Sequence, residues 1–374
     1  MSEQQGSRRR FLKGAAVATA AGLATPSVVR AQGPISMRFQ STWPSKDIFH
    51  EFAGDYAKKI NDMTGGDLRI EVLPAGAVVP AFGILDAVSK GTLDGGHGVM
   101  VYHYGKQTAL ALWGSGPGFA MDANMLLSWH KYGGGKELLE KLYASIGANV
   151  VSMPYGPMPT QPLGWFKKPV ARAEDLQGLK FRTVGISIDV FQGMGSAVNA
   201  LPGGEIVSAM DRGLLDAAEF NNASSDRALG FADVSKVSML QSYHQNAESF
   251  EVLWSKAKYD ALPEKMRAII LNATEAASQD MAWKAIDRYS KDYAELAAGG
   301  VRFYRTPDAI LKKQLEVYDE VVKKKAGENP LFKEILQSQL AFAQRTTKWE
   351  QDTVVNRRMA YDHYFGQNAA AKKI

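Results

Sequence analysis

AMDRGLLDAAEF (residues 209–220) repeats a pattern that occurs earlier in the chain, in AVSKGTLDGG (residues 87–96). Both segments read A-x-x-K/R-G-x-L-D, and an LP-x-G turn precedes each of them, at Leu73 and at Leu201. One junction of helix, glycine and strand would be an ordinary feature, but two with the same turn upstream indicate two similar α/β lobes. In lobes of this kind, ligands bind beyond the carboxyl ends of the strands.

The segment after residue 34 predicts how such a lobe is built. ISMRFQST, from Ile35, alternates like a strand, and the next segment places its apolar residues on one helical face until Gly65 and Gly66 end it. DLRIEVLPAG (67–76) alternates again, so strand, helix and strand follow one another within about 40 residues. Such a βαβ unit implies a parallel sheet. We therefore expect an α/β fold of two lobes.

Composition and charge exclude several classes of function. The 374 residues are 45% hydrophobic, which allows a large core, and the absence of cysteine excludes disulfides, thiolate metal sites and a cysteine nucleophile. The net charge is +5, but residues 1–31 hold five basic side chains and one acidic side chain. Without them, 39 Lys and Arg face 38 Asp and Glu, a net charge of +1. No basic field remains that would recruit nucleic acid.

Residues 1–31 predict an export signal. SRRRFLKGAA carries the Arg8 and Arg9 pair and the Lys13 of a twin-arginine signal, followed by an apolar stretch and a small-residue boundary at Ala31. The apolar stretch is shorter than the roughly 20 residues that span a bilayer. We expect cleavage after Ala31 and a soluble mature protein in the periplasm, exported by the twin-arginine route.

Two charged residues are candidates for a ligand site because their neighbours are apolar. Arg182, in LKFRTVG, lies near the end of a predicted strand, and Glu219 follows two alanines where another strand should end. An arginine matches a carboxylate with two hydrogen bonds, so a small organic acid is its natural ligand, although a surface position or a structural ion pair fits the pattern too. A buried Glu219 needs a cation or a donor beside it, which is either a metal ion or a salt bridge with Arg182.

A resemblance to a known family rests on four segments: LKFRTVG, GEIVSAMDRGLLDAAEF, KYDALPEKMRAII and TQPLGWF. They resemble the DctP family, the solute-binding proteins of tripartite ATP-independent periplasmic (TRAP) transporters, and within it the branch that binds 2-oxo acids. The resemblance covers essentially the whole chain after the signal. It implies a two-lobe periplasmic solute-binding fold with a central cleft and long C-terminal helices. It also implies a receptor that delivers a small monocarboxylate, a 2-oxo or 2-hydroxy acid, to the membrane permease subunits.

The resemblance also implies roles for individual residues. Arg182 is expected to clamp the ligand carboxylate. A cation, Na⁺ or Ca²⁺, is expected to bridge to the same carboxylate, held by Gln161, Glu219 and the backbone carbonyl of Phe220. Such an all-oxygen set suits a hard cation, which would also balance the charge of Glu219.

The sequence departs from that branch at several positions that are expected to face the ligand. Phe220 stands where close relatives carry Trp, and Asn221 lies in a loop that replaces a bulkier one. Tyr102 is a single tyrosine where relatives have two in a row, and Gln245 takes the place of an acidic residue. Trp43, after the first strand, is a further candidate for the pocket wall. These differences leave the identity of the ligand acid open.

An enzyme is the alternative class, because a cleft with Glu and Arg would also suit a periplasmic lyase that acts on a small organic acid. The sequence contains no H-E-x-x-H pair, no G-x-S-x-G elbow and no P-loop. His97 and His103 are spaced badly for one helical face. The sequence therefore favours a receptor without catalytic residues.

The C-terminal region predicts long helices and a protein partner. A helix is expected from Pro307 to about Gly327, and residues 332–365 contain no proline or glycine, which permits one long helix or two abutting ones. The apolar residues of this region are too numerous for a solvated tail. They either pack back on the lobes or, as the resemblance implies, are exchanged between the protomers of a homodimer.

The expected organisation of the chain has four parts. They are the signal (1–31), lobe I (34–154, with a return segment at about 248–300), lobe II (155–247), and the C-terminal helices (301–374), which span the lobes and contact the partner protomer.

Overall fold

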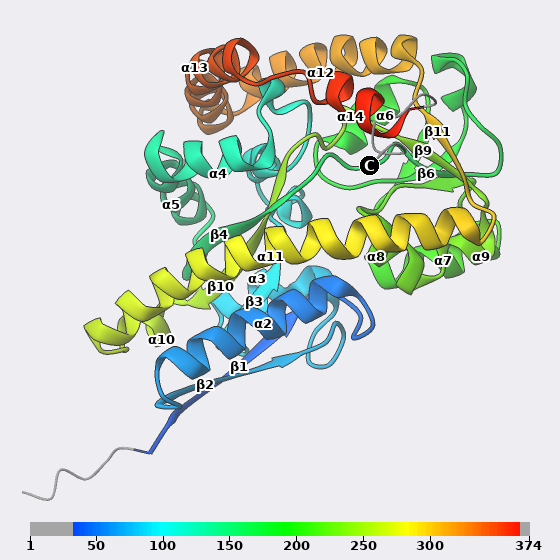
Figure 1. Ribbon diagram of the computed structural model, residues 1–374. Coiled ribbons are helices and arrows are strands. Elements are labelled where there is room, and N and C mark those ends of the chain that lie inside the picture. The colour runs from blue at the N-terminus through cyan, green and yellow to red at the C-terminus, as the bar shows by residue number, and fades with distance from the viewer. Residues whose placement is uncertain (1–32, 367–374) are drawn as a thin grey trace, which may run out of the picture. The chain divides into compact units, whose positions relative to one another are not determined.

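The computed structural model describes residues 33–366, so the predicted signal lies outside the described residues. Residues 36–366 belong to one compact unit that contains two separate β-sheets (Figure 1). No helix within residues 33–366 is long and apolar enough to cross a membrane.

The first sheet has five strands: β1 (Ile35–Ser41), β2 (Leu68–Leu73), β3 (Gly95–Gly98), β4 (Val150–Met158) and β10 (Glu248–Ser255). Their order is β2-β1-β3-β10-β4. β1 and β3 are parallel, in agreement with the parallel sheet that the βαβ pattern implied, whereas β10 runs antiparallel to both of its neighbours. The chain forms strands β5 to β9 of the second sheet before it returns with β10, and the antiparallel β10 makes the first sheet mixed.

The second sheet has six strands: β5 (Gly164–Phe166), β6 (Lys180–Arg182), β7 (Ala197–Asn199), β8 (Ala217–Ala218), β9 (Val237–Leu240) and β11 (Arg302–Arg305). Their order is β11-β9-β5-β8-β6-β7. β6 is parallel to β7 and β8, and β5 is antiparallel to β8 and β9. This sheet is therefore mixed in the same way as the first.

The helices are α2 (Ile48–Met63), α3 (Ile84–Ser89), α4 (Ala123–Tyr132), α5 (Gly135–Ser145), α6 (Ser187–Gly193), α7 (Gly203–Asp211), α8 (Ala223–Leu229), α9 (Phe231–Val234), α10 (Lys256–Asp260), α11 (Glu264–Ala298), α12 (Asp308–Glu328), α13 (Pro330–Thr353) and α14 (Arg357–Phe365). Short 3-10 helices are η1 (Ala81–Gly83), η2 (Met100–His103), η3 (Thr108–Trp113), η4 (Gly118–Ala120) and η5 (Ala173–Leu176). The 35-residue α11 packs on α2 and β4 at one end and on α8 at the other, so it runs alongside both sheets (Figure 1).

The internal repeat corresponds to matching elements in the two sheets. The strand order β2-β1-β3 of the first sheet matches β7-β6-β8 of the second. In each case a helix, α3 or α7, ends just before a glycine with positive φ, Gly91 at 76° and Gly213 at 72°. Glycine adopts this backbone conformation without the strain that a side chain would add. The shared glycine therefore marks the same turn from helix to strand in both lobes.

The shared aspartates have matching roles as well. Asp94 accepts a hydrogen bond from the backbone N–H of Arg38 at 2.8 Å, and Asp216 accepts one from that of Lys180 at 3.1 Å. Each aspartate ties the strand that it precedes to the neighbouring parallel strand. The repeat thus reflects two lobes built to the same plan, and the predicted two-lobe α/β fold class is confirmed.

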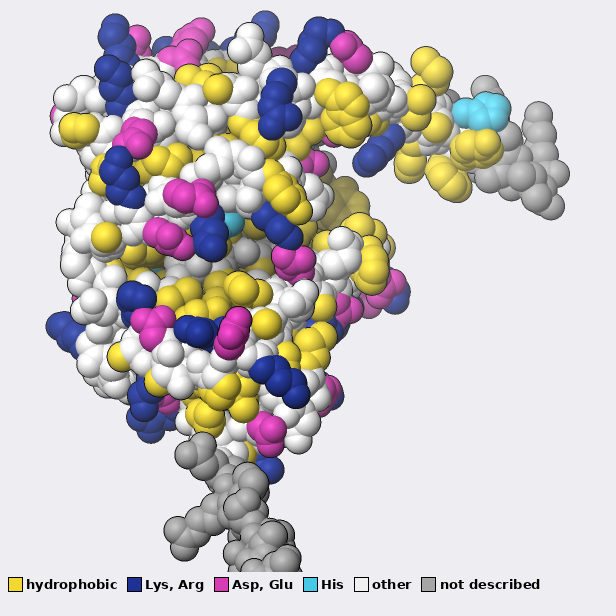
Figure 2. All heavy atoms as spheres, turned by 90° about the vertical axis from the view of Figure 1, so that its left-hand side faces the viewer, with side chains coloured by type: hydrophobic (Ala, Val, Ile, Leu, Met, Phe, Trp, Pro, Cys, Tyr) yellow, Lys and Arg dark blue, Asp and Glu magenta, His cyan; other side chains and the backbone are white. Residues whose placement is uncertain are grey.

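The C-terminal region forms separate helices after α12, not one continuous helix. α13 packs back on the core and buries Phe332, Ile335 and Phe342. The helix ends at Thr353, and α14 follows with no buried side chain among its described residues. Figure 2 shows this last helix standing away from the neighbouring surface, with hydrophobic side chains along it. Packing on the chain's own lobes therefore accounts for α13 but not for α14.

Candidate ligand-binding site

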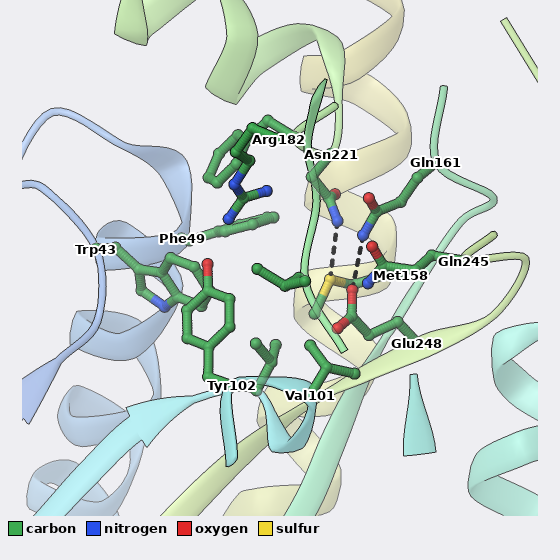
Figure 3. A pocket seen from close by; sticks show the side chains of 13 residues that line it. Trp43, Phe49, Val101, Tyr102, Met158, Gln161, Arg182, Asn221, Gln245 and Glu248 are labelled. Carbon is green, nitrogen blue, oxygen red and sulfur yellow. Dashed lines mark hydrogen bonds between the residues drawn. The ribbon is translucent and has the colours of Figure 1, made fainter. Parts of the chain in front are cut away.

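A small cavity, here called the central pocket, is lined mostly by residues that follow or belong to strands of both sheets, with Phe49 from α2 (Figure 3). The empty space in the cavity and its opening is about 250 Å³. Its lining residues are Trp43, Phe49, Val99, Val101, Tyr102, Met158, Gln161, Arg182, Val184, Phe220, Asn221, Gln245 and Glu248. The mixed polar and apolar lining suits a small polar molecule.

The structure brings most of the predicted site residues together. Seven of the eight line the central pocket: Trp43, Tyr102, Gln161, Arg182, Phe220, Asn221 and Gln245. The eighth, Glu219, is not part of the lining and contacts Arg182 instead. The role of each residue in ligand binding stays a prediction.

Arg182 is the only Lys or Arg among the described residues that line the pocket. It ends strand β6 and is 1% exposed. Its Nε donates to the backbone carbonyl of Leu201 at 2.8 Å, and its Nη1 donates to the Oε1 and the carbonyl of Glu219 at 2.8 and 3.2 Å. Its Nη2 is buried and has no hydrogen-bond partner within residues 33–366. The protein thus holds the guanidinium through Nε and Nη1, and Nη2 is the donor without a partner.

Glu219 follows β8 and is completely buried. Burial raises the pKa of its carboxyl to about 7, although the charge of Arg182 beside it acts in the opposite direction. The salt bridge with Arg182, one of the two alternatives that the sequence left open, is therefore present. The second oxygen, Oε2, has no hydrogen-bond partner in the described part of the chain. His244 Nε2 lies 4.0 Å from this oxygen, and burial lowers the pKa of His244 to about 3, so this histidine supplies no positive charge to Glu219.

Glu248, the first residue of β10, is the polar residue of the pocket that sequence reasoning missed. Its Oε2 accepts a hydrogen bond from Gln161 Nε2 at 2.7 Å (Figure 3). Burial, and after it the negative charge of Glu219, raises the pKa of Glu248 well above its ordinary value. The available signal was an acidic residue in ESFEVLWS, a strand whose eight residues are all buried.

Two glutamines complete the polar side of the pocket. The backbone N–H of Gln161 donates to the carbonyl of Gln245 at 3.1 Å, which holds the two segments together. Three side-chain oxygens in this region are buried without a hydrogen-bond donor among the described residues: Gln161 Oε1, Gln245 Oε1 and Glu248 Oε1. A buried polar atom without a partner costs about 1–3 kcal/mol, so acceptors in this number indicate a ligand or ion that supplies the missing contacts.

Aromatic residues form the apolar side of the pocket. The ring of Trp43 lies 5.7 Å from that of Tyr102 and 6.5 Å from that of Phe220, and its Nε1 donates to His97 at 2.9 Å. Phe220 also lies under the guanidinium of Arg182, at 5.9 Å. These contacts hold Trp43 in the wall, as expected. They leave its indole N–H bonded to the protein and not to the pocket.

Asn221 lies between the central pocket and a second, wider cavity. Its Nδ2 lies 3.3 Å from the sulfur of Met158, and its Oδ1 accepts from Asn222 at 3.0 Å. Asn222 in turn caps α8. The position of Asn221 is thus fixed by the start of that helix.

The predicted cation ligands fit a hard cation by their chemistry. Within residues 33–366, no three His, Cys, Asp or Glu side chains are grouped so that they would hold a metal ion. The candidate set is of another kind, because it combines an amide oxygen, a carboxylate oxygen and a backbone carbonyl. Two of its members, Gln161 Oε1 and Glu219 Oε2, are buried oxygens that lack a partner in the described residues. Oxygen ligands of this type are those that Na⁺ and Ca²⁺ prefer.

Comparison with known proteins places the chain in a family. Residues 39–329 match the family described as bacterial extracellular solute-binding protein, family 7 (DctP). A monocarboxylate 2-oxoacid-binding periplasmic protein of Nostoc sp. (strain PCC 7120) is 31% identical over 349 residues, which cover 91% of this chain and 95% of that protein.

Solved structures agree with the sequence match. A TRAP transporter solute-binding protein of Bordetella bronchiseptica, a dimer with calcium and picolinate at one site, has a TM-score of 0.83 at 27% identity, covering 89% of this chain and 97% of that chain. Similar proteins of Colwellia psychrerythraea, with calcium and pyruvate, and of Pseudoalteromonas atlantica, with sodium and pyruvate, both have TM-scores of 0.81. Their identities are 27% and 26%, and they cover 88% and 89% of this chain and 99% of each of those chains.

These proteins are periplasmic receptors of transporters, which favours the receptor over the lyase that the sequence left as the alternative. The matched region contains every predicted site residue. The chain belongs to the DctP family of bacterial extracellular solute-binding proteins.

Proposed function

We propose that this receptor captures a small monocarboxylate, a 2-oxo or 2-hydroxy acid, in the central pocket and delivers it to the membrane permease of a TRAP transporter. The observation that carries the proposal is the buried Nη2 of Arg182, which has no partner in the described residues. An unpaired buried donor is costly, and a ligand carboxylate would satisfy it with a charge-assisted hydrogen bond. The pyruvate and picolinate bound by the related proteins are acids of suitable size and type.

A cation is part of the proposed site. Gln161, Glu219 and the backbone carbonyl of Phe220 would hold Na⁺ or Ca²⁺, and the cation would supply positive charge for a second contact with the ligand carboxylate. The unpartnered oxygens of Gln161 and Glu219 support this assignment. The calcium or sodium bound by the related proteins supports it as well.

We assign the two lobes to residues 34–154 with the return segment 248–300, and to residues 155–247. Residues 301–374 then form the C-terminal region. The central pocket has contributions from both lobes, for example Trp43 from the first and Arg182 from the second. A ligand that contacts both lobes would favour their closed arrangement, which is the form that the permease would recognise.

Export by the twin-arginine route is part of the proposal. The relatives are periplasmic, and the Arg8 and Arg9 pair supplies the signal that this route reads. Replacing both arginines with lysine is expected to keep the precursor in the cytoplasm. Fractionation of cells that carry the wild-type chain and the variant would measure this.

A homodimer through the C-terminal helix is the proposed assembly. α14 carries exposed apolar side chains, among them Met359 (72% exposed) and Phe365 (65%), and α11 carries Trp283 (65%) and Ile286 (72%) on its exposed side. Apolar surface of this extent is unusual on a monomer. Burying α14 of each protomer on the other would cover it. The Bordetella bronchiseptica protein is also a dimer.

The central experiment is a ligand screen by thermal unfolding, because a ligand of the folded state raises its stability by mass action. Pyruvate, longer 2-oxo acids, picolinate and 2-hydroxy acids are tested with and without Na⁺ or Ca²⁺. The proposal predicts a higher unfolding temperature with at least one of these acids. Calorimetry on the positive compounds gives the affinity. If none of them binds under any cation condition, the proposed ligand class is wrong.

A further inference from the structure

We infer that His244 is a positioning residue of the ligand site, held by hydrogen bonds from helix α12 so that its Nε2–H points towards Glu219. Through Glu219, it keeps the guanidinium of Arg182 in the position that leaves Nη2 for the ligand. The inference rests on the proposed function, in which Arg182 binds the ligand carboxylate. His244 neither lines the central pocket nor belongs to the predicted site residues.

His244 lies in the segment that connects the two sheets. Residues 241–246 lead from the end of β9 in the second sheet towards the start of β10 in the first. The backbone carbonyl of His244 accepts from Ser187 Oγ at 2.7 Å and from the N–H of Gly116 at 2.5 Å. The side chain is buried, and the ring of Phe191 lies 5.6 Å from the imidazole. The surroundings therefore fix the position of the imidazole.

Gln314, a buried residue of α12, is the anchor of the hydrogen bonds. A backbone N–H can only donate, so the atom of Gln314 that meets the N–H of Tyr243 at 2.9 Å is Oε1. The atom that meets Ser242 Oγ at 2.7 Å is then Nε2, which can only donate. The backbone thus fixes the orientation of the amide, and Ser242 Oγ is the acceptor of this bond.

Ser242 decides which nitrogen of His244 carries the proton. Its Oγ lies 2.6 Å from His244 Nδ1, and it already accepts from Gln314 and, at 3.3 Å, from the backbone N–H of His244. Both acceptor positions of the oxygen are used, so its own proton is donated to Nδ1. Burial, and after it the charge of Arg182, lowers the pKa of His244 to about 3, so the imidazole is neutral and has one N–H. The hydrogen bonds assign this N–H to Nε2.

Nε2 faces the salt bridge of the ligand site. It lies 4.0 Å from Glu219 Oε2, and neither atom has a hydrogen-bond partner in the part of the chain that the structure describes. The separation is longer than a hydrogen bond, so the N–H acts on the carboxylate as a dipole. The opposite tautomer would turn a nitrogen lone pair towards the same oxygen and repel it. The contacts of Ser242 therefore decide whether His244 attracts or repels Glu219.

Glu219 passes this effect on to Arg182. Its other side-chain oxygen, Oε1, accepts from Arg182 Nη1 at 2.8 Å, and its backbone carbonyl accepts from the same nitrogen at 3.2 Å. Because a carboxylate is planar and rigid, a turn that moves Oε2 away from His244 also moves Oε1 relative to Nη1. The guanidinium then loses a contact that directs Nη2. Helix α12 is thus linked to the proposed ligand contact, although none of its residues lines the central pocket.

The tautomer is tested first, on the ligand-free mature protein labelled with ¹⁵N-histidine. The measurement is made at pH 8, above the pKa of about 7 to which burial raises Glu219, so that Glu219 is ionised. NMR shows which imidazole nitrogen carries the proton, and His244 is the one of six histidines whose signals are absent from His244→Gln. We expect a neutral imidazole with the proton on Nε2. A proton on Nδ1, or a charged imidazole, overturns the inference.

Pyruvate binding tests the role of His244 in the site, by calorimetry in buffer that contains both Na⁺ and Ca²⁺. His244→Leu removes the N–H, so the affinity should fall by about 10-fold, the scale of one hydrogen bond to a charged group. His244→Gln carries an amide N–H that reaches about as far as Nε2 and should restore most of the affinity. His244→Asn, whose amide reaches only as far as Nδ1, should not.

Packing alone would be served by Leu at least as well as by Gln. An affinity in His244→Leu equal to that of His244→Gln therefore overturns the positioning role. If His244→Leu does not fold, the comparison of His244→Gln with His244→Asn decides.

Gln314→Leu tests the anchor, and Gln339→Leu is its matched control. Gln339 is a buried glutamine of α13 that donates to the carbonyl of Leu112 at 2.8 Å, and neither residue lines the pocket. Both variants lose a buried hydrogen bond, so both should unfold at lower urea concentration. Only Gln314→Leu frees Ser242, so only this variant should shift the nitrogen signals of His244 towards the average of the two tautomers. It should also weaken pyruvate binding by about 3- to 10-fold.

Equal losses of affinity in Gln314→Leu and Gln339→Leu would overturn the link to α12, and so would unchanged His244 signals in Gln314→Leu. The tautomer measurement separates this inference from the proposed function, because it needs no ligand. A proton on Nδ1 together with firm pyruvate binding overturns the inference and leaves the receptor function standing. A proton on Nε2 in a protein that binds no acid of the screen overturns the proposed function, and with it the role of His244 in the site.

Discussion

Replacing Arg182 with Lys tests the proposed carboxylate contact most directly. The guanidinium uses Nε for the carbonyl of Leu201 at 2.8 Å and Nη1 for Glu219 at 2.8 Å, which leaves Nη2 for the ligand. A lysine has a single nitrogen at the end of its chain, so it cannot hold Leu201, Glu219 and a ligand in three directions. We expect the ammonium group to keep the charge pair with Glu219 and to lose the other contacts.

The expected loss has two parts. Ligand binding should weaken by about 1.5 to 3 kcal/mol, the contribution of one charge-assisted hydrogen bond. This loss corresponds to a dissociation constant roughly 10- to 150-fold higher. Separately, the partly buried carbonyl of Leu201 loses its donor, which should lower the free energy of unfolding by about 0.5 to 1.5 kcal/mol.

Calorimetry with pyruvate in the presence of Ca²⁺ measures the first part, and urea denaturation measures the second. Arg172→Lys is the control, because Arg172 is an exposed arginine that is paired only with Asp175 three residues away. It should change neither quantity by more than about 0.5 kcal/mol. If Arg182→Lys binds pyruvate as tightly as the wild type, Arg182 is not the carboxylate contact.

Three further predictions concern the cation, the assembly and pH. Glu219→Gln should weaken the binding of the cation and of pyruvate together, because each ligand raises the affinity for the other. If calorimetry shows tighter pyruvate binding instead, Glu219 only balances the charge of Arg182. Deleting residues 354–374 should convert the dimer to a folded monomer in light scattering, because α13 and its buried side chains are kept; a monomeric full-length protein would refute the exchange. Burial raises the pKa of Asp226 from 3.8 to about 7. Between these two pH values the folded protein holds a proton on Asp226 that the unfolded chain has lost, so the stability of the wild type should fall as the pH rises towards 7. Asp226→Asn should therefore gain stability relative to the wild type between pH 5 and pH 8 in urea denaturation, and parallel pH profiles would contradict this.

The sequence by itself determined the architecture of each lobe, because the signals for it are local. The repeated pattern around Gly91 and Gly213 needs only a glycine that turns the chain with positive φ and an aspartate that ties the next strand to its neighbour. The periodicity of apolar residues gave β1, α2 and β2 in the same way, since a helix or strand buries one face according to residues a few positions apart. The absence of proline and glycine from residues 332–365 permitted one long helix or two abutting ones there, but it did not place the break at residues 354–356.

Only the tertiary structure shows which strands run antiparallel to their neighbours and which side chains meet in the pocket. The antiparallel positions of β5 and β10 depend on when the chain crosses between the sheets, and periodicity does not encode that order. Gln161, Phe220 and Gln245 were placed at the site by resemblance and not by pattern. Neither the resemblance nor the sequence pattern identified Glu248. Its strand is buried on both faces, so an alternation of polar and apolar residues does not show which side chains face the pocket. Its partner Gln161 lies 87 residues away, and their hydrogen bond forms only once β10 has paired with β4 in the first sheet.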